Sequence, residues 1–425
     1  MLIKFKEMLL KIKLVRKFGD FIWHILDKIE DAKAYRRLKK ISKINYEPNE
    51  KIKVVFLAQC VQVWDKISSI YEKMREDEKF DVYILAISDI TDKEGNETFT
   101  YYSKTYDRVI NASEKEGECF DLEGLHPNYV FYTRPYDSYL PKQYRSDVIS
   151  KYAKICYTPY AFVNLKSTEK TCFPNNFFRN IYFYFTADKI TEKSNVEQYP
   201  KAHKKGYRHS VYKGYPILEK YNQINKKTNL HNPTILWTPR WTNNKELGGS
   251  NFLNYYKEIY KYAINDKNVK LIFRPHPLLF YHFKETGALS EQDIESYKNM
   301  YISAENCTLD ENASYYDTFE NADILITDIS SMLFEWYITE KPIIYCDTGV
   351  NNDFSEGMKK EIKGCYIAYN WEDVKVFLKQ LKNGEDSLKE KRMAICNNLF
   401  GKETLNATSN IIETIRNDFE NRRTR

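Results

Sequence analysis

The stretch ADILITDISSMLFEW, residues 322–336, decides the fold of this 425-residue chain. Residues 322–328 form an apolar run of strand length, and a helical pattern starts at Ser330. An apolar strand that leads directly into a helix is typical of a parallel sheet, because helices cover both of its faces. The same alternation continues on both sides of this stretch, so the sequence predicts an α/β fold.

Two groups of predicted strands lie on either side of a polar segment, residues 214–233, which starts with Gly-Tyr-Pro and ends with Asn-Pro. The first group is expected at 51–59, 81–88, 128–133, 151–158 and 180–186, and the second at 234–239, 269–275, 300–303, 322–328 and 342–347. We therefore expect two Rossmann-like domains, 51–213 and 234–400, that face a cleft, with 214–233 as the linker and 401–425 as a C-terminal helix. GT-B glycosyltransferases share this layout, although a layout alone does not establish a reaction.

The positive charge is confined to an N-terminal arm, predicted as residues 1–50. Residues 1–40 hold twelve Lys and Arg against five acids, a net charge of +7, whereas the other 385 residues hold 53 against 54 and carry −1. A nucleic-acid enzyme more often spreads its basic residues along a groove of the body. We therefore expect no nucleic-acid partner.

The arm also shows the pattern of a basic amphipathic helix. Apolar residues recur at helical spacing and continue through Phe18, Phe21, Ile22, Trp23 and Ile25, with lysines between them; the first set is Leu2, Phe5, Leu9, Ile12 and Val15. Such a helix is expected to bind an anionic membrane surface through residues 1–40, as a peripheral protein at the cytoplasmic face of a bacterial membrane. The alternative is a helix packed on its own protein or on a second subunit.

Three loops after predicted strands of the second domain carry polar groups suited to a diphosphate. They contain Trp237-Thr238-Pro239-Arg240-Trp241, Arg274-Pro275-His276-Pro277 and Thr327-Asp328-Ile329-Ser330-Ser331. The two prolines aim His276, the start of a helix favours an anion, and Arg240, Arg274 and His276 are expected to supply positive charge. Glu335 lies one turn after Ser331 and is expected to accept hydrogen bonds from ribose. Each feature has a simpler explanation, because Ser330 or Asp328 would also cap a helix, His276 could be satisfied within its loop, and Arg240 could be a surface charge.

These residues resemble the CDP-glycerol glycerophosphotransferase family, the polymerases and primases of teichoic acids and related capsules. The resemblance lies in TILWTPRW (234–241), LIFRPHP (271–277), ADILITDISSMLFEW (322–336) and KPIIYC (341–346), and more loosely in FYTRPYDSYLP (131–141), KICYTPYAF (154–162) and GYPILEKY (214–221). It implies a GT-B fold with an acceptor-binding first domain and a donor-binding second domain. It further implies that an acceptor hydroxyl attacks the β-phosphorus of a CDP-alditol and that CMP leaves.

The resemblance also implies roles for particular residues. His276 would contact the diphosphate, Ser330 and Ser331 would hold phosphate, and Arg240 and Arg274 would neutralise charge. Thr238 and Asp328 are further candidates for binding the donor, and Glu335, where the family usually has Asp, would bind ribose. The donor would carry glycerol phosphate or ribitol phosphate, and the acceptor would be a lipid-linked or polymeric hydroxyl.

One motif of the family is missing. Many members carry Trp-His-Gly in the first domain, where this chain reads Tyr157-Thr158-Pro159-Tyr160. His126 and Asp137 are the candidates to replace that histidine in activating the acceptor.

Two other functions fit the sequence: a GT-B glycosyltransferase that uses a UDP-sugar, and a non-catalytic, membrane-bound assembly subunit that keeps the nucleotide pocket. No cofactor is expected. No metal site is expected either, because the second domain has no clustered Asp-x-Asp pair; Asp323 and Asp328 stand at the two ends of a strand.

Overall fold

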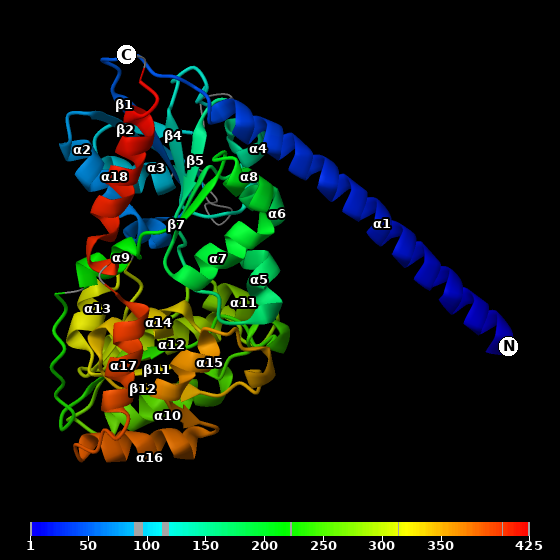
Figure 1. The fold of residues 1–425 in the computed structure, drawn as a ribbon. Helices are drawn as coiled ribbons and strands as arrows, with labels where there is room; N and C mark the ends of the chain where they lie inside the picture. Colours follow the sequence, from blue (N-terminus) through cyan, green and yellow to red (C-terminus); the bar gives the residue numbers. More distant parts are fainter. Residues whose placement is uncertain are drawn as a thin grey trace.

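The computed structural model describes residues 2–88, 97–112, 119–221, 223–312, 314–401 and 403–423, with side chains except those of residues 2–21 and 170–172. Two domains lie one above the other in Figure 1, and the long helix α1 (Leu2–Ile41) runs away from both.

The first domain is built on a parallel sheet, which has seven strands in the described part of the chain, in the order β3-β2-β1-β4-β5-β6-β7. Alternate residues of β1 (Ile52–Ala58) point to opposite faces: Val54 and Phe56 enter one apolar cluster, and Val55 and Leu57 enter the other. Both faces are therefore covered. The other strands are β2 (Phe80–Ala86), β3 (Val109–Asn111), β4 (Tyr129–Tyr132), β5 (Lys154–Tyr157), β6 (Phe183–Thr186) and β7 (His209–Tyr212).

The helices of the first domain follow its strands and cover both faces of the sheet. Helix α7 starts after Asp188, whose carboxylate caps it by accepting the backbone N–H of Thr191 at 2.7 Å. The helices up to the linker are η1 (Val61–Lys66), α2 (Ser68–Glu76), α3 (Glu97–Thr105), η3 (Asp137–Tyr139), η4 (Lys142–Tyr144), α4 (Ser146–Ile149), α5 (Lys166–Cys172), α6 (Asn175–Phe178), α7 (Lys189–Gln198), α8 (Pro200–Lys204) and α9 (Pro216–Tyr221).

The second domain has a parallel sheet of six strands among the described residues, in the order β10-β9-β8-β11-β12-β13. The stretch quoted first forms β11 and α14, as predicted, and β11 lies at the middle of the sheet between β8 and β12. The strands are β8 (Thr234–Thr238), β9 (Lys270–Phe273), β10 (Cys307–Leu309), β11 (Ile324–Thr327), β12 (Ile343–Cys346) and β13 (Tyr366–Ala368).

Helices again cover both faces of this second sheet. They are η5 (Lys245–Leu247), α10 (Phe252–Ile264), α11 (Leu279–Glu285), α12 (Glu291–Ser303), α13 (Tyr316–Asn321), α14 (Ser331–Trp336), η6 (Tyr337–Thr339), η7 (Asn351–Asp353), α15 (Met358–Glu361), η8 (Ile362–Gly364), α16 (Trp371–Lys382) and α17 (Lys389–Leu399). The chain then continues through η9 (Thr404–Asn406) to α18 (Ala407–Glu420), which packs on the first domain.

The two domains share an apolar interface on the side of their strand ends. Phe162, which follows β5, stacks on Phe334 of α14 with ring centres 5.1 Å apart. Leu165 and Ala187 of the first domain belong to the same buried cluster as Leu333 of α14 and residues of α9. The carboxyl ends of the two sheets therefore face each other, as the sequence predicted for a GT-B fold.

Several predicted boundaries are wrong. Residues 300–303 end helix α12 instead of forming a strand, and the strand lies at Cys307–Leu309. The segment 214–233, predicted as a linker, contains α9, whose Ile217 and Leu218 are buried. The C-terminal helix α18 belongs to the core of the first domain, where Ile411, Ile415 and Phe419 are buried; Figure 1 shows it crossing back from the second domain.

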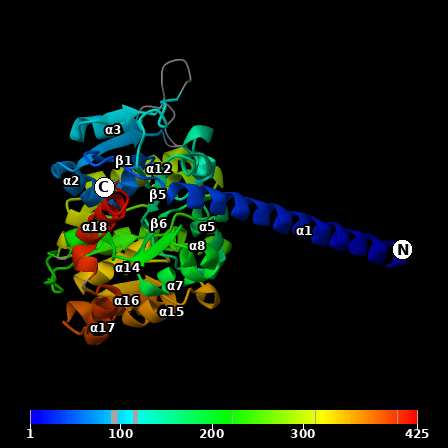
Figure 2. The same ribbon diagram turned by 45° about the horizontal axis from the view of Figure 1, so that its top comes forward.

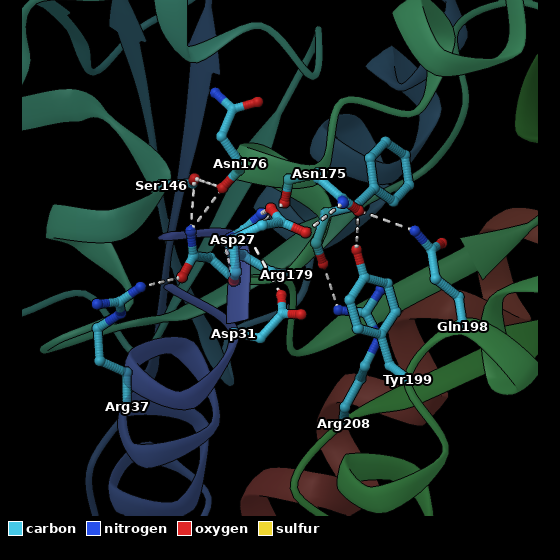
Figure 3. A network of polar contacts seen from close by, with 12 residues as sticks. Asp27, Asp31, Arg37, Ser146, Asn175, Asn176, Arg179, Gln198, Tyr199 and Arg208 are labelled. Atoms are coloured by element: carbon cyan, nitrogen blue, oxygen red, sulfur yellow. Dashed lines mark hydrogen bonds and ion pairs between the residues drawn. The ribbon is translucent and has the colours of Figure 1, made fainter. Parts of the chain in front are cut away.

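The arm is divided into a docked part and a projecting part. Side chains near its end, among them Leu38 and Ile41, are buried in the core of the first domain. The buried Arg179 forms ion pairs with Asp27 and Asp31 of α1, as Figure 3 shows. The helix is therefore held to the body from Asp27 onward, by two acids of the arm and not by its excess of basic residues.

Apolar side chains of α1 contact solvent along the projecting part and, at Ile29, on the exposed side of the docked part. The exposed ones are Ile22, Trp23, Ile25, Leu26 and Ile29, and Trp23 is 73% exposed. The apolar positions expected at Leu2, Phe5, Leu9, Ile12, Val15, Phe18 and Phe21 lie outside the described side chains. Figures 1 and 2 show from two directions that α1 leaves the body well before its N-terminus. Among the described residues, no helix is long and apolar enough to cross a membrane.

Deleting residues 1–25 should leave the melting temperature nearly unchanged, whereas deleting residues 1–41 should lower it. The longer deletion removes the buried side chains of Ala34, Leu38 and Ile41 and takes away the acidic partners of Arg179. We expect a loss of about 3 kcal/mol or more, which corresponds to a fall of roughly 6 °C or more. Leu38→Ala and Ile29→Ala serve as the buried and exposed pair of point variants. Thermal melts in which the two deletions behave alike would show that the helix does not dock as described.

Candidate active site

The site is built on three neighbouring strands of the second sheet. Because β9, β8 and β11 are adjacent and parallel, their following loops lie side by side at one edge. These loops carry the residues around Arg240, His276 and Ser330, which are distant in sequence. In open α/β sheets this carboxyl edge is where ligands bind.

His276 is held as a neutral hydrogen-bond donor. Its Nδ1 accepts the backbone N–H of Leu278 at 3.1 Å, so the proton of the neutral ring resides on Nε2. The residue is exposed to solvent, although nearby protein atoms reduce the hydration of its ring. This partial loss of hydration, with a smaller contribution from the Arg240 charge, lowers the pKa to about 4. A lowered pKa agrees with the hydrogen bond at Nδ1, because only an unprotonated ring nitrogen can accept a hydrogen bond.

Arg240 is held through its backbone and its side chain by two adjacent residues of the loop after β11. Its backbone N–H donates to Asp328 Oδ2 at 3.1 Å, and its guanidinium donates to the carbonyl of Ile329 at 2.9 Å. Gly248, at φ 106°, packs against this side chain so closely that a Cβ there would lie 2.8 Å from Nε. The β8 exit loop therefore needs glycine at this position to wrap around the arginine.

Asp328 and Thr238 organise the loops and are not open to a ligand. The buried Asp328 carboxylate accepts hydrogen bonds from Arg240, Ser250 and the backbone N–H of Asn251, the last two at 3.1 Å, and burial raises its pKa to about 6. The Thr238 hydroxyl is buried and donates to Thr327 at 2.9 Å. We expected the side chains of Asp328 and Thr238 to contact the donor. With both side chains buried and hydrogen-bonded within the protein, that expectation is wrong for this arrangement of the loops.

The two serines have different positions. Ser330 is the N-cap of α14, and its hydroxyl accepts the backbone N–H of Met332 at 3.2 Å, so the simpler explanation of a helix cap applies to it. Ser331 is the first residue of the helix and is half-buried. No hydrogen bond within the described residues occupies its hydroxyl, which leaves it available to a ligand.

Arg274 is largely engaged within the protein. Its guanidinium lies 2.7 Å from Asp310, donates to the carbonyl of Asn312 at 2.7 Å, and stacks over the ring of Tyr315 with 5.3 Å to the centroid. Asp310 is buried and balances the charge. The predicted role of Arg274 in neutralising a diphosphate is therefore weakened, and Arg240 is better placed for it.

Glu335 is closed off from any ribose. It is fully buried, and its two carboxylate oxygens lie 2.6 and 2.7 Å from Nζ of Lys66, a residue of the first domain. Tyr315 donates to the same carboxylate, and the Tyr215 hydroxyl lies 3.4 Å from it. The predicted ribose contact is wrong for this arrangement, because Glu335 lies on the side of α14 that faces the first domain.

Neither proposed replacement for the missing histidine lies at the site. His126 precedes β4, at the amino edge of the sheet and thus at the opposite edge from the site. Asp137 is buried and accepts hydrogen bonds from the backbone N–H of Ser146 at 2.8 Å and from its hydroxyl at 2.6 Å. His126 is thus far from the site along the strand direction, and the Asp137 carboxylate is occupied in holding the start of helix α4.

Sequence reasoning missed the tyrosines and the lysine of the domain interface. Tyr136 and Tyr160, at the exits of β4 and β5, have hydroxyls 2.8 Å apart. Lys66 falls between apolar residues of a predicted helix, where a lysine is normally solvated, so no local signal marks it. Within the described ranges no three His, Cys, Asp or Glu side chains gather as metal ligands would.

A hollow of about 580 Å³ lies beside the Arg240 loop, where the two domains meet. It is lined by Ser167 of the first domain and by Lys245, Glu246, Leu247, Val350, Asn352 and Asp353 of the second. Its volume falls within the range of small-molecule sites.

The profile of the family described as CDP-Glycerol:Poly(glycerophosphate) glycerophosphotransferase matches residues 179–417, more than half of the chain. The chain belongs to this family. It is accordingly a transferase of the CDP-glycerol glycerophosphotransferase type, as its loops suggested. No curated protein matches the whole sequence significantly.

Solved structures confirm the GT-B type of fold. A wall teichoic acid polymerase, TagF, solved with CDPG, is 14% identical with a TM-score of 0.52, over 96% of this chain and 98% of TagF. The UDP-GlcNAc 2-epimerase of Neisseria meningitidis, bound to UDP-GlcNAc, is 12% identical with a TM-score of 0.55, over 86% of this chain and all of the epimerase. At these identities the likeness concerns the fold alone.

His276→Ala should lower turnover by about two orders of magnitude, the scale for losing a donor that stabilises transition-state charge. His276→Gln keeps an N–H donor and should retain more activity than the alanine variant. Because the pKa is lowered to about 4, the ring stays neutral from pH 5 upward, and turnover should show no break near pH 6.5. A loss of turnover as the pH rises through 6.5, absent in His276→Gln, would instead identify a charged imidazolium as the active form.

Proposed function

We propose that the protein transfers glycerol phosphate or ribitol phosphate from a CDP-activated donor to a hydroxyl of a lipid-linked or polymeric acceptor, in the synthesis of teichoic acid or a capsule polymer. The observation that carries this proposal is the convergence of the His276 Nε2–H, the Arg240 loop and the start of α14 at one edge of the second sheet. Membership of the glycerophosphotransferase family supports it.

The chemistry needs stabilisation of the negative charge that develops on the transferred phosphate. The acceptor hydroxyl oxygen attacks the β-phosphorus and loses its proton to solvent, the bond from that phosphorus to the bridging oxygen breaks, and CMP leaves with the electrons of that bond. Negative charge then grows on the phosphate oxygens. A fixed N–H donor on His276, the guanidinium of Arg240 and the hydroxyl of Ser331 with the first N–H groups of α14 are the groups that would stabilise it.

The released nucleotide tests this function. Incubation with CDP-glycerol or CDP-ribitol and a lipid-linked acceptor should release CMP in proportion to the phosphodiester formed. Release of UDP from a UDP-sugar instead would indicate a glycosyltransferase. Binding of a CDP compound without turnover of any donor would indicate a non-catalytic assembly subunit.

We further propose that the projecting part of α1 holds the enzyme on an anionic membrane surface at the cytoplasmic face of the bacterial membrane. The exposed side chains of Ile22, Trp23, Ile25, Leu26 and Ile29, together with the basic residues upstream, support this proposal. A lipid-linked acceptor would be reached from that surface.

Replacing Ile22, Trp23 and Leu26 by serine should weaken sedimentation with vesicles that contain an anionic lipid, without changing the melting temperature. Ile190→Ser is the control, because Ile190 is an exposed isoleucine of the body. Binding of the unaltered protein should decrease as salt rises, since screening acts over about 10 Å at 0.1 M salt. Unchanged vesicle binding together with a lower self-association of the triple variant would identify a second copy as the occupant.

A further inference from the structure

We propose that the buried ion pair between Lys66 and Glu335 is a positioning device, which sets how closely the two domains approach and thereby places the loop that carries Arg274 and His276. The inference rests on the proposed function only where donor binding and turnover are measured. The claim about domain spacing concerns the two domains alone.

The ion pair joins the two domains directly. Lys66 ends the helix η1, which follows the first strand of the first domain, and Glu335 belongs to α14 of the second domain. The lysine side chain is 7% exposed and the glutamate is fully buried. A buried charge is tolerated only with a partner at good geometry, so separation of the domains would leave two unpaired charges. Burial lowers the pKa of Lys66, and the Glu335 carboxylate opposes that effect only in part.

Tyrosine hydroxyls complete the surroundings of this pair. Tyr315 contacts both Nζ of Lys66 and the Glu335 carboxylate, and Tyr215, where the chain passes between the domains, lies 3.4 Å from the same carboxylate. The lysine Nζ also lies 4.8 Å from the centroid of the Tyr315 ring and 5.7 Å from that of Tyr215. First domain, connecting segment and second domain therefore meet at one carboxylate.

The ring of Tyr315 links this cluster to the site. Its hydroxyl end contacts the ion pair, and the Arg274 guanidinium lies over its ring at 5.3 Å. Arg274 is two residues before His276, and its other contacts, with Asp310 and Asn312, stay within the second domain. A change in domain spacing that moves Lys66 would thus disturb Tyr315 and, through Arg274, the loop that aims His276.

The position of the start of α14 also depends on the Lys66–Glu335 ion pair. Glu335 is four residues after Ser331 on this short helix, so the ion pair fixes the helix that presents the Ser331 hydroxyl. Small errors of position are costly in such sites, where a displacement of about 1 Å can reduce rates roughly a hundredfold. The pair is therefore expected to act on donor binding and turnover without touching the donor.

The chain offers a closely matched control. Lys154 is also a buried lysine, 2.6 Å from a carboxylate, Asp418, and it lies over the rings of Tyr46, Tyr129 and Tyr182. Asp418 belongs to α18, which packs within the core of the first domain. Lys66→Met and Lys154→Met thus remove the same kind of interaction, across the domains in one case and within the first domain in the other.

We expect small-angle scattering to show a larger radius of gyration for Lys66→Met than for the unaltered protein, and no change for Lys154→Met. Lys66→Met should weaken binding of CDP-glycerol about tenfold and lower kcat, as loss of positioning predicts, whereas Lys154→Met should affect only the melting temperature. If Lys66→Met fails to fold, Lys66→Met with Glu335→Met removes both charges and keeps an apolar contact; it should fold yet retain the increased radius.

An unchanged radius of gyration in a folded Lys66→Met protein would overturn the proposal. Tighter binding of CDP-glycerol by that variant would overturn it as well, because Lys66 would then compete with the donor for Glu335 instead of positioning the loop. If the unaltered protein does not bind CDP-glycerol, the proposed function fails, but the scattering comparison still decides the role of the ion pair.

Discussion

The carboxylate of Glu335 is the point at which both domains and the segment between them meet. Lys66 approaches it from the first domain, Tyr215 from the connecting segment and Tyr315 from the second domain. Around it, Phe162 and Leu165 extend the apolar interface toward α14. Parallel sheets carry their ligand-binding loops at the carboxyl edge. The relative orientation of the two edges therefore determines the size and shape of the space that a substrate can occupy between them. One buried charge thus constrains the geometry of the whole enzyme.

Within the second domain, the polar residues of the motif divide into those that hold the loops and those that remain available. Asp328 joins the exits of β8 and β11 to the start of α10, and Ser330 caps α14. The groups that remain available to a ligand are the Nε2–H of His276 and the hydroxyl of Ser331. A buried carboxylate that accepts several hydrogen bonds keeps the loops rigid, which is what a site preorganised for phosphate requires.

The sequence was sufficient for the fold because the signals were long and repeated. Apolar runs such as 322–328, each followed by a helical pattern, indicate strands covered on both faces. The strands β3, β7 and β13, which lie at edges of the two sheets, were not predicted. The loops around His276 and Ser330 were placed correctly, since adjacent parallel strands bring their exits together. Glu335, His126 and Asp137 were misjudged because their partners, Lys66 and Ser146 among them, are brought near only by tertiary packing. Helical spacing put Glu335 near Ser331 but could not show that a lysine of the other domain faces it.

The position of the donor tests the central claim most directly, namely that the diphosphate binds where the β8, β9 and β11 loops converge. In a crystal structure with CDP-glycerol, the diphosphate should lie within hydrogen-bonding distance, about 3 Å, of the His276 Nε2 and of the first N–H groups of α14. The Lys66–Glu335 pair should be intact in that complex. A diphosphate bound elsewhere, for example in the hollow beside Lys245 with His276 out of reach, would contradict the claim.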